Sequence, residues 1–421
     1  MTLSLFASLI IVIGTIYALI KRYETRLVLI TAGFLMACIS LDPMMAFHQF
    51  DASMTKSSLI IAICSAMGFA SVIALTKCDV HLVALLLKPV GKLGIFLLPV
   101  GMCITAVCSV AITSTAGICA AIGPTLIPIL VRAGFHPAIA AGSIVASVFP
   151  AYYNPGIAHN VFVAKLADME VMDLIILMSD KIFIIFSGLV IGLTAVCLIY
   201  KDFRKDGFGE LTVEQNKDNA LPEKVNIFYA VAPLIPVAIL LYCTLYTDLK
   251  ISVATAMLIG AAYALTITRS NPADVTRKFF DGMGKAYANI LGIIIAAGVF
   301  AAGLKAAGVI DLLVDFLRNS NEWAKIGGSV GPYVMGLMTG SGDAAAFAFN
   351  EAVTPHAAQF GTTIPDLGYL AVMAGALGRT SSPLCGGLII AAGIAGVNPV
   401  EIVKRTAPAC LAVLAVTYVI F

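Results

Sequence analysis

Apolar runs long enough to cross a lipid bilayer alternate with short polar segments along the 421 residues of this chain. A transmembrane helix needs about 20 mainly apolar residues. The runs predict continuous helices at these positions: 3–20, 27–41, 58–76, 182–200, 226–246, 249–267, 286–304 and 406–420. Together with the interrupted segments described below, they predict an all-α polytopic membrane protein with about ten transmembrane helices.

The composition excludes a soluble globular protein. Hydrophobic residues make up 60% of the chain and charged residues 12%, whereas soluble domains hold about 25% charged residues. The formal net charge of +2 gives no indication of a nucleic-acid partner. The ten cysteines lack the spacing of metal ligands, so we expect no cofactor and no metal apart from a coupling ion such as Na⁺ or H⁺.

The distribution of lysine and arginine predicts the orientation. Lys21, Arg22 and Arg26 follow the first apolar run, and cytoplasmic loops carry an excess of positive charge. The amino terminus is therefore expected outside, and the segments 42–56 and 165–181 are expected to be external. Continued along the chain, the rule predicts a multi-pass membrane protein with both termini on the external side.

Residues 93–131 form a stretch without charged side chains between cytoplasmic Lys92 and Arg132. A segment that crossed twice in full would place its turn at the far interface, where charged residues are expected. The centre of this stretch holds only the small polar run Thr113-Ser114-Thr115. We therefore predict a re-entrant inner hairpin whose tip stops at mid-depth.

A broken helix is predicted at 137–163, interrupted at Asn154-Pro155. The second part of the chain repeats this order, with an outer hairpin at 308–360 and a broken helix at 366–395. The chain therefore divides into these parts: a first repeat at 1–200, a cytoplasmic linker at 201–225 and a second repeat at 226–421.

Matching features recur at one spacing in the two parts. Ser114 and Ser341 are 341 − 114 = 227 residues apart, and Asn154 and Ser382 are 382 − 154 = 228 apart. Because Arg269 marks the cytoplasmic side, the second part runs in the opposite direction. These features predict an inverted-topology repeat, in which interrupted helices surround the binding site of a secondary transporter.

The chemistry of the four breaks indicates an anion site. Ser, Thr, Asn and Asp can cap a half-helix, and Pro suits its first position. Each helix amino terminus carries a partial positive charge and free N–H donors. The candidate substrate-binding residues are Thr113, Ser114, Thr115, Asn154, Ser341, Gly342, Arg379, Thr380, Ser381 and Ser382. The alternative is that the breaks are ordinary Pro and Gly kinks, which neighbouring Ser and Thr repair.

Two charged residues lie inside apolar segments of the second repeat. Arg379 can hold a carboxylate in a bidentate manner, or it can form a structural ion pair with Asp343 or Asp366. Asp343, with Ser114 and Asn154, is a candidate for ion coupling, and its alternative role is that of a plain helix cap.

Three further residues could carry protons. His159, Glu351 and His356 lie toward the ends of segments, where a solvated structural role is expected.

The sequence argues against two other classes of protein. The run Gly340-Ser341-Gly342-Asp343 matches a pattern of intramembrane aspartyl proteases. Such an enzyme needs a second aspartate that shares a proton with the first, and the Tyr-Asp pattern that usually supplies it is absent from the sequence. A channel would favour identical filters from several subunits over four different tips in one chain. Because no ATP-binding motif is present either, the sequence favours a carrier driven by ion or substrate gradients.

The chain resembles the DcuC family of anaerobic C4-dicarboxylate transporters, which belongs to the ion transporter superfamily. The resemblance lies in the segments 109–131, Ala151-Tyr152-Tyr153-Asn154-Pro155, Gly340-Ser341-Gly342-Asp343-Ala344, Leu377-Gly378-Arg379-Thr380-Ser381-Ser382-Pro383 and Val403-Lys404-Arg405-Thr406. It implies inverted repeats with two opposed hairpins and a homodimer through scaffold helices. It also implies carriage of succinate, fumarate or a similar small dicarboxylate across the inner membrane by alternating access, as symport or antiport.

The resemblance assigns roles to particular residues. Ser341 and Gly342 would form the outer hairpin tip, 113–117 the inner tip, and 379–382 part of the substrate or ion site. The family is expected to have asparagine where this chain has Asp343. This departure leaves a monocarboxylate, a hydroxy acid or an amino acid open as the substrate.

Overall fold

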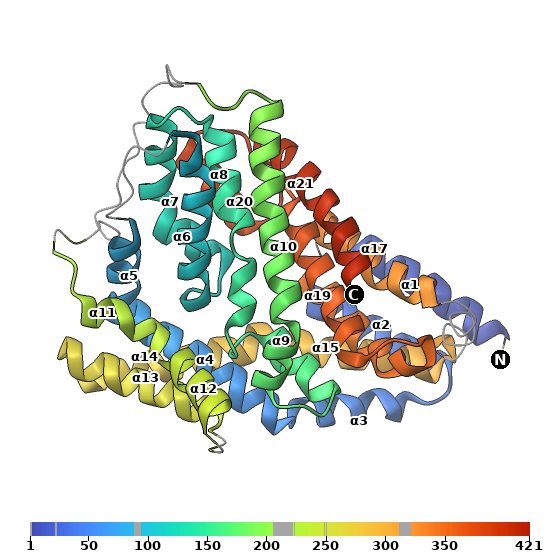
Figure 1. The fold of residues 1–421 in the computed structure, drawn as a ribbon. Coiled ribbons are helices and arrows are strands. Elements are labelled where there is room, and N and C mark those ends of the chain that lie inside the picture. The colour runs from blue at the N-terminus through green and yellow to red at the C-terminus, as the bar shows by residue number, and fades with distance from the viewer. Residues whose placement is uncertain are drawn as a thin grey trace.

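Helices form nearly all of the regular structure in the computed structural model (Figure 1). The structure describes residues 2–21, 23–87, 94–204, 222, 224–247, 249, 251–310 and 321–421. Within these ranges no β-strand occurs, and a single isolated bridge joins Phe135 to Phe203. The expected all-α architecture is confirmed.

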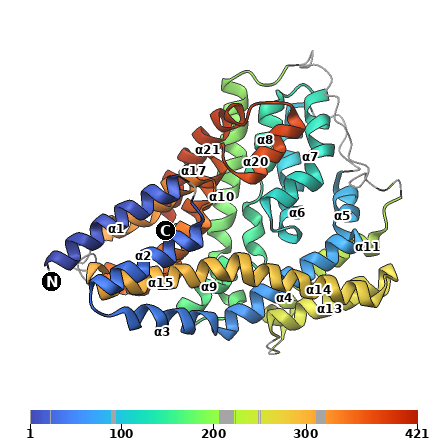
Figure 2. The same cartoon turned by 180° about the vertical axis from the view of Figure 1, so that it is seen from behind.

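One group of helices runs across the lower part of Figures 1 and 2, except that α1 rises diagonally beside α2, and we name this group the scaffold layer. Its members are α1 (Thr2–Ile20), α2 (Thr25–Ile39), α3 (Pro43–Met54), α4 (Ser57–Thr76), α11 (Ile227–Val231), α12 (Ile235–Tyr246), α13 (Val253–Thr268), α14 (Pro272–Ala286) and α15 (Gly292–Ala306). A π-helical turn at Tyr287–Leu291 joins α14 to α15 without a break in the helix. Such turns are rare and often lie at functional sites.

The second group stands on this layer, and we name it the hairpin module. Its members are α6 (Leu97–Ala111), α7 (Thr115–Arg132), α8 (Pro137–Ala146), α9 (Ala158–Leu166), α10 (Val171–Ile199), α17 (Asn321–Thr339), α18 (Asp343–Ala352), α19 (Ile364–Thr380), α20 (Gly386–Ala395) and α21 (Pro399–Ile420). The hairpin module also contains the short 3₁₀ helices η1 (Gly94–Phe96), η2 (Phe149–Tyr153) and η6 (Thr354–Phe360), whereas η4 (Ala232–Leu234) joins α11 to α12 in the scaffold layer. Helix α5 (Cys78–Leu87) connects the two groups, and packs on α11 and on α6.

Glycine allows the helices of the scaffold layer to pack backbone against backbone. A Cβ atom placed on Gly33 of α2 would lie 2.4 Å from the carbonyl oxygen of Val299 in α15. A Cβ on Gly303 of α15 would lie equally close, at 2.4 Å, to the carbonyl oxygen of Gly33. Small residues at helix contacts are the usual device for close packing in membranes, where apolar side chains gain little by leaving lipid.

The two groups meet across an apolar contact. Helix α4 packs on α9, and α15 packs on α18. Phe162 of α9 and Phe347 of α18 are almost fully buried there, together with small residues of α15. The half-helices of the hairpin module therefore lie directly against the scaffold layer.

Equivalent helices begin at a constant spacing. The starts of α7 and α18 are 343 − 115 = 228 residues apart, and the same difference separates α9 from α20 (386 − 158) and α10 from α21 (399 − 171). Left-handed backbone recurs at this spacing too, at Leu41 and Arg269 and at Asp168 and Gly396. This regularity supports the proposal of an internal repeat. That the repeats are inverted and the hairpins re-entrant stays a prediction.

Two segments expected to be loops are helical. Residues 43–54, expected within an external loop, form α3, because Asp42 accepts a hydrogen bond from the Met45 N–H and Pro43 takes the first helical position. Residues 272–286, for which no helix was predicted, form α14. This helix is amphipathic and buries Val275 and Phe279. A search for uniformly apolar runs overlooks such helices.

Other boundaries also differ from the prediction. Helix α10 begins at Val171 and so takes in most of the segment 165–181 that was expected outside. Most of the linker predicted at 201–225 and the part of the outer hairpin at 311–320 lie outside the described residues.

Five helices of the described ranges are long and apolar enough to cross a membrane, and a sixth counts if the two parts of α7, bent by 57°, form one span. Other apolar helices, including α8 and α20 with 10 residues each, are too short to span alone. The expectation of about ten transmembrane helices stays a prediction.

Candidate functional site

Four helices of the hairpin module begin at one place. Helix α7 begins after Ser114, whose Oγ accepts a hydrogen bond of 3.3 Å from the Gly117 N–H. Helix α18 begins after Gly342, α9 after Ile157 and α20 after Cys385. Within the described ranges, none of these three amino termini has a side-chain cap. Their first N–H groups therefore remain available to a ligand.

These four amino termini line a cavity of about 400 Å³. Met67 of α4 and Ile290 of the π-helical turn close it from the scaffold layer. The lining residues from the hairpin module are Thr113, Ser114, Thr115, Ala116, Val148, Ala151, Tyr152, Gly156, Ile157, Ala158, His159, Gly340, Ser341, Asp343, Phe347, Arg379, Cys385, Gly386 and Gly387. We name it the central cavity. It lies between the two groups of helices and collects the positive ends of four of them.

Arg379 enters the central cavity from the last turn of α19. Its Nε is buried and has no hydrogen-bond partner among the described residues. Neither carboxylate proposed as its structural partner pairs with it, because Asp343 pairs with His159 and Asp366 pairs with Lys181. A buried guanidinium donor without an acceptor is costly, so the geometry favours an anion as the missing partner. The hydroxyl of Thr115 is likewise buried without a partner.

Asp343 and His159 form a pair across the central cavity. His159 Nε2 lies 3.1 Å from Asp343 Oδ1, and the imidazole stacks on Phe347 with ring centroids 4.2 Å apart. The expectation of a solvated structural role for His159 is wrong, since the residue is buried and lines the cavity. The signal in the sequence that could have identified it is its place shortly after the predicted break at Asn154-Pro155.

The other residues predicted to bind the substrate do not line the central cavity: Asn154, Gly342, Thr380, Ser381 and Ser382. Asn154 holds the first break in place, since its Nδ2 donates to the carbonyl of Val110 at 2.7 Å and its Oδ1 accepts from the Gly156 N–H at 2.8 Å. Gly342 packs against α19, where an added Cβ would lie 2.3 Å from the carbonyl oxygen of Gly375.

Three polar residues at the second break are buried behind the cavity. Thr380 donates to the carbonyl of Ala376 at 2.9 Å. Ser381 Oγ accepts from the Tyr333 hydroxyl at 3.1 Å, and Ser382 Oγ accepts from the Leu384 N–H at 3.2 Å. These side chains shape the break, and they are not part of the cavity lining.

The expected capping pattern holds at one break of the four. Ser114 caps α7, as predicted. Asn154 and Ser382 do not cap a helix, because α9 and α20 begin four residues after them, beyond a turn that contains Pro155 or Pro383. Ser341 lines the cavity, but it does not cap α18.

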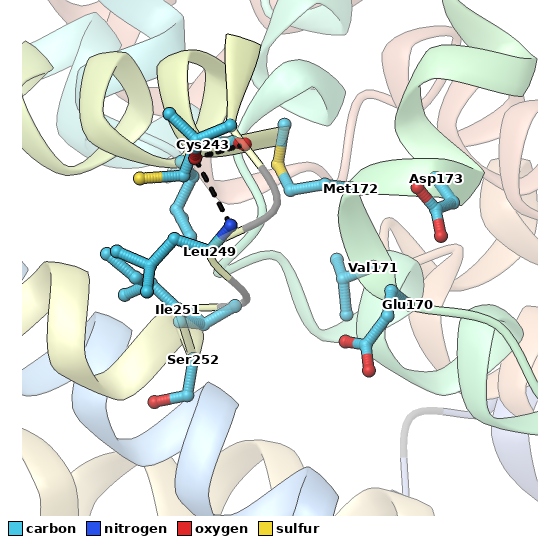
Figure 3. Close-up of a pocket in the computed structure, with 11 residues that line it drawn as sticks. Glu170, Val171, Met172, Asp173, Cys243, Leu249, Ile251 and Ser252 are labelled. Atoms are coloured by element: carbon cyan, nitrogen blue, oxygen red, sulfur yellow. Dashed lines mark hydrogen bonds between the residues drawn. The ribbon is translucent and has the colours of Figure 1, made fainter. Parts of the chain in front are cut away.

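A second cavity, of about 360 Å³, lies between the start of α10 and the segment that joins α12 to α13 (Figure 3). Glu170 and Asp173 line one side of it, and Ser252 lies on the other. Its lining within the described residues holds no lysine or arginine. The second cavity is therefore less suited to a carboxylate than the central cavity.

Comparison with known proteins identifies the family. The sequence profile of the DcuC family, described as C4-dicarboxylate anaerobic carrier, matches residues 40–421. The chain belongs to this family. The anaerobic C4-dicarboxylate transporter DcuC of Escherichia coli is 24% identical over 449 aligned positions, which cover 99% of this chain and 96% of that protein. A Haemophilus influenzae protein described as a transporter is 44% identical over 267 residues, 61% of this chain and 94% of its own.

The fold also has a counterpart among solved structures. The YdaH transporter of Alcanivorax borkumensis superposes with a TM-score of 0.65 at 15% identity, over 89% of this chain and 86% of that one. At this identity the likeness concerns the fold alone. Membership of the carrier family shows that the chain is a membrane transporter and not an enzyme. The aspartyl protease alternative is thereby excluded.

Proposed function

We propose that this chain is a secondary active transporter of a small carboxylate, in the first place a C4-dicarboxylate such as succinate or fumarate, in the bacterial inner membrane. The observation that carries the proposal is the central cavity, where four helix amino termini meet the unpartnered Nε of Arg379. Helix termini and a guanidinium together hold a carboxylate with directed hydrogen bonds.

The dimensions of the site agree with this class of substrate. About 400 Å³ leaves room for a four-carbon diacid and a few waters, since binding pockets of about 300 Å³ and more accept larger molecules. Arg379 and the α20 terminus lie in the second half of the chain, and the α7 and α9 termini lie in the first. A molecule with a carboxylate at each end can engage both halves.

We infer that transport proceeds by alternating access. In support, the central cavity lies between the scaffold layer and the hairpin module, and equivalent helices of the two parts of the chain share one spacing. A module that rocks or slides against a fixed layer would expose such a cavity to each side in turn. The inverted repeat, the inner and outer hairpins, the periplasmic termini and a homodimer through the scaffold layer belong to the same proposal.

A second class of substrate is favoured by one observation. Asp343 places a carboxylate in the central cavity beside Arg379. This arrangement could bind the ammonium group of an amino acid as well as its carboxylate.

Exchange of labelled substrate tests the proposal. Proteoliposomes are loaded with unlabelled succinate and given labelled succinate outside, and competitors are then added: fumarate, lactate, malate and aspartate. We expect accumulation of label that fumarate suppresses most. Suppression by aspartate and not by fumarate would transfer the assignment to amino acids, and the absence of succinate exchange in folded protein would overturn the assignment of a C4-dicarboxylate.

A further inference from the structure

The His159–Asp343 pair joins the two parts of the chain inside the central cavity. His159 belongs to the first turn of α9 and Asp343 to the first turn of α18, so each stands at a break of a different repeat. The imidazole is held between Asp343 and the ring of Phe347. The pair is therefore part of the surface that a substrate meets.

The groups that face the pair differ in their ability to change charge. Arg379 of α19 stays protonated at any physiological pH. Tyr152 of η2, whose ring centroid lies 6.4 Å from that of His159, brings a phenol to the cavity, and Cys385 before α20 brings a thiol. Met67 and Ile290, from the scaffold layer, do not titrate. His159 and Asp343 are thus the groups of the cavity lining whose protonation can respond to a substrate.

The charges of the empty cavity do not match a dicarboxylate. With His159 neutral and Asp343 ionised, the charges of His159, Asp343 and Arg379 sum to zero, and a bound dianion would add two negative charges. Helix termini supply only partial compensation. Each proton taken up by the pair moves this sum one charge toward neutrality. Because an uncompensated charge in a buried site is costly, binding of the substrate and binding of a proton favour each other.

The geometry also provides a place for the proton. His159 Nε2 is engaged with Asp343, whereas its Nδ1 is buried and has no hydrogen-bond partner in the part of the chain that the structure describes. In the tautomer that donates from Nε2, Nδ1 is a free acceptor. It can bind a proton without breaking an existing hydrogen bond, and the carboxylate of Asp343 then stabilises the imidazolium.

We propose that the His159–Asp343 pair is the proton-coupling site of this carrier. It takes a proton from water on the side to which the cavity is open when the carboxylate binds, and it returns that proton to water on the opposite side when the carboxylate leaves. The inference rests on the proposed function, because it requires an anionic substrate in the same cavity.

The ratio of protons to succinate tests the inference. Proteoliposomes that enclose a pH indicator receive labelled succinate, and luminal acidification is divided by the amount of succinate taken up. The wild type is expected to acidify the lumen and to respond to an inward proton gradient. For Asp343→Asn and for His159→Gln we expect fewer protons per succinate, whatever the remaining rate. His48→Gln, on the exposed side of α3, is the matched control and should keep the wild-type ratio.

The outcomes separate the two proposals. Succinate uptake by the wild type without proton movement, or with a response to Na⁺ only, would overturn the inference and leave the carboxylate assignment intact. An unchanged ratio in both variants would overturn it as well. If one variant does not fold, the other variant and the wild-type ratio still decide. A wild type that carries no carboxylate would refute the proposed function itself.

Discussion

At the scale of single residues, the important feature of the central cavity is the buried Nε of Arg379, which has no acceptor among the described residues. A buried donor left without an acceptor costs about 1–3 kcal/mol, and more when the group is charged. Such a side chain lowers the stability of the empty carrier and raises its affinity for an anion. Its position in the last turn of α19 also keeps the guanidinium next to the amino terminus of α20, which begins after the break.

The substitution Arg379→Ala should abolish binding of succinate, because removal of one partner from a buried charged pair costs about 2–5 kcal/mol. Arg379→Lys should bind with intermediate affinity, since lysine keeps the charge but cannot form the bidentate fork. Equilibrium binding of labelled succinate to purified protein measures both effects.

Arg277→Ala, on the exposed face of α14, is the control for loss of a positive charge. Undiminished binding by a folded Arg379→Ala protein would remove this residue from the substrate site.

Charged residues within apolar segments are visible in the sequence, and this contrast, together with the nearby helix breaks, predicts cavity roles for Arg379 and Asp343. The role of His159 could not be predicted in this way, because its environment depends on where α9 begins. The same uncertainty about where a helix begins explains why the expected capping roles of Asn154 and Ser382 are wrong. A residue caps a helix only when the helix begins directly after it, and the turns at Pro155 and Pro383 delay both helices.

At the scale of elements, the hairpin module depends on contacts between helix backbones. A Cβ on Gly336 of α17 would lie 2.5 Å from the carbonyl oxygen of Gly375 and 2.9 Å from the N atom of Arg379, both in α19. The close packing of α17 on α19 thus fixes the helix that carries Arg379.

Gly336→Ala should therefore destabilise the protein by about 1–3 kcal/mol, the usual cost of overpacking, and lower its affinity for succinate. Gly331→Ala, on the same helix, is the matched control because a Cβ there meets nothing within 4 Å. Thermal unfolding in detergent compares the two proteins. Equal midpoints would show that α17 and α19 are free to separate.

Elements of uniform apolar sequence were predictable, and amphipathic ones were not. The long apolar runs of α4 and α10 are visible in any hydropathy reading. Helix α14 has an apolar and a polar face, and α3 mixes polar with apolar residues, so neither helix forms a uniform apolar run. Their existence follows from packing against α2 and α15, and against α4, which the sequence does not reveal.

At the scale of the whole molecule, polar contacts connect the scaffold layer to the hairpin module. Glu351 of α18 accepts hydrogen bonds from Lys56 and from Gln49 of α3, each at 3.3 Å. Lys56 also lies over the ring of Phe162 in α9. These contacts must break if the module moves against the layer.

A covalent link at this position should therefore stop transport. With cysteines introduced by Lys56→Cys and Glu351→Cys, a short bifunctional thiol reagent should abolish succinate exchange, and its cleavage should restore exchange. The two single variants treated alike control for modification of one cysteine and of the native thiols. Full exchange by the linked protein would contradict movement between the two groups.

The central claim is that the substrate occupies the central cavity. It is tested most directly by the reactivity of a thiol introduced by Gly386→Cys, since this position lines the cavity and a Cβ there meets nothing within 4 Å. Labelling by a hydrophilic maleimide is followed at this residue by mass spectrometry, beside Gly284→Cys on the exposed face of α14.

At ten times its dissociation constant, succinate should slow labelling at position 386 by about tenfold, because only the unoccupied fraction reacts. It should leave labelling at position 284 unchanged. Equal rates at position 386 with and without succinate, in a protein that exchanges succinate, would place the substrate elsewhere and contradict the account.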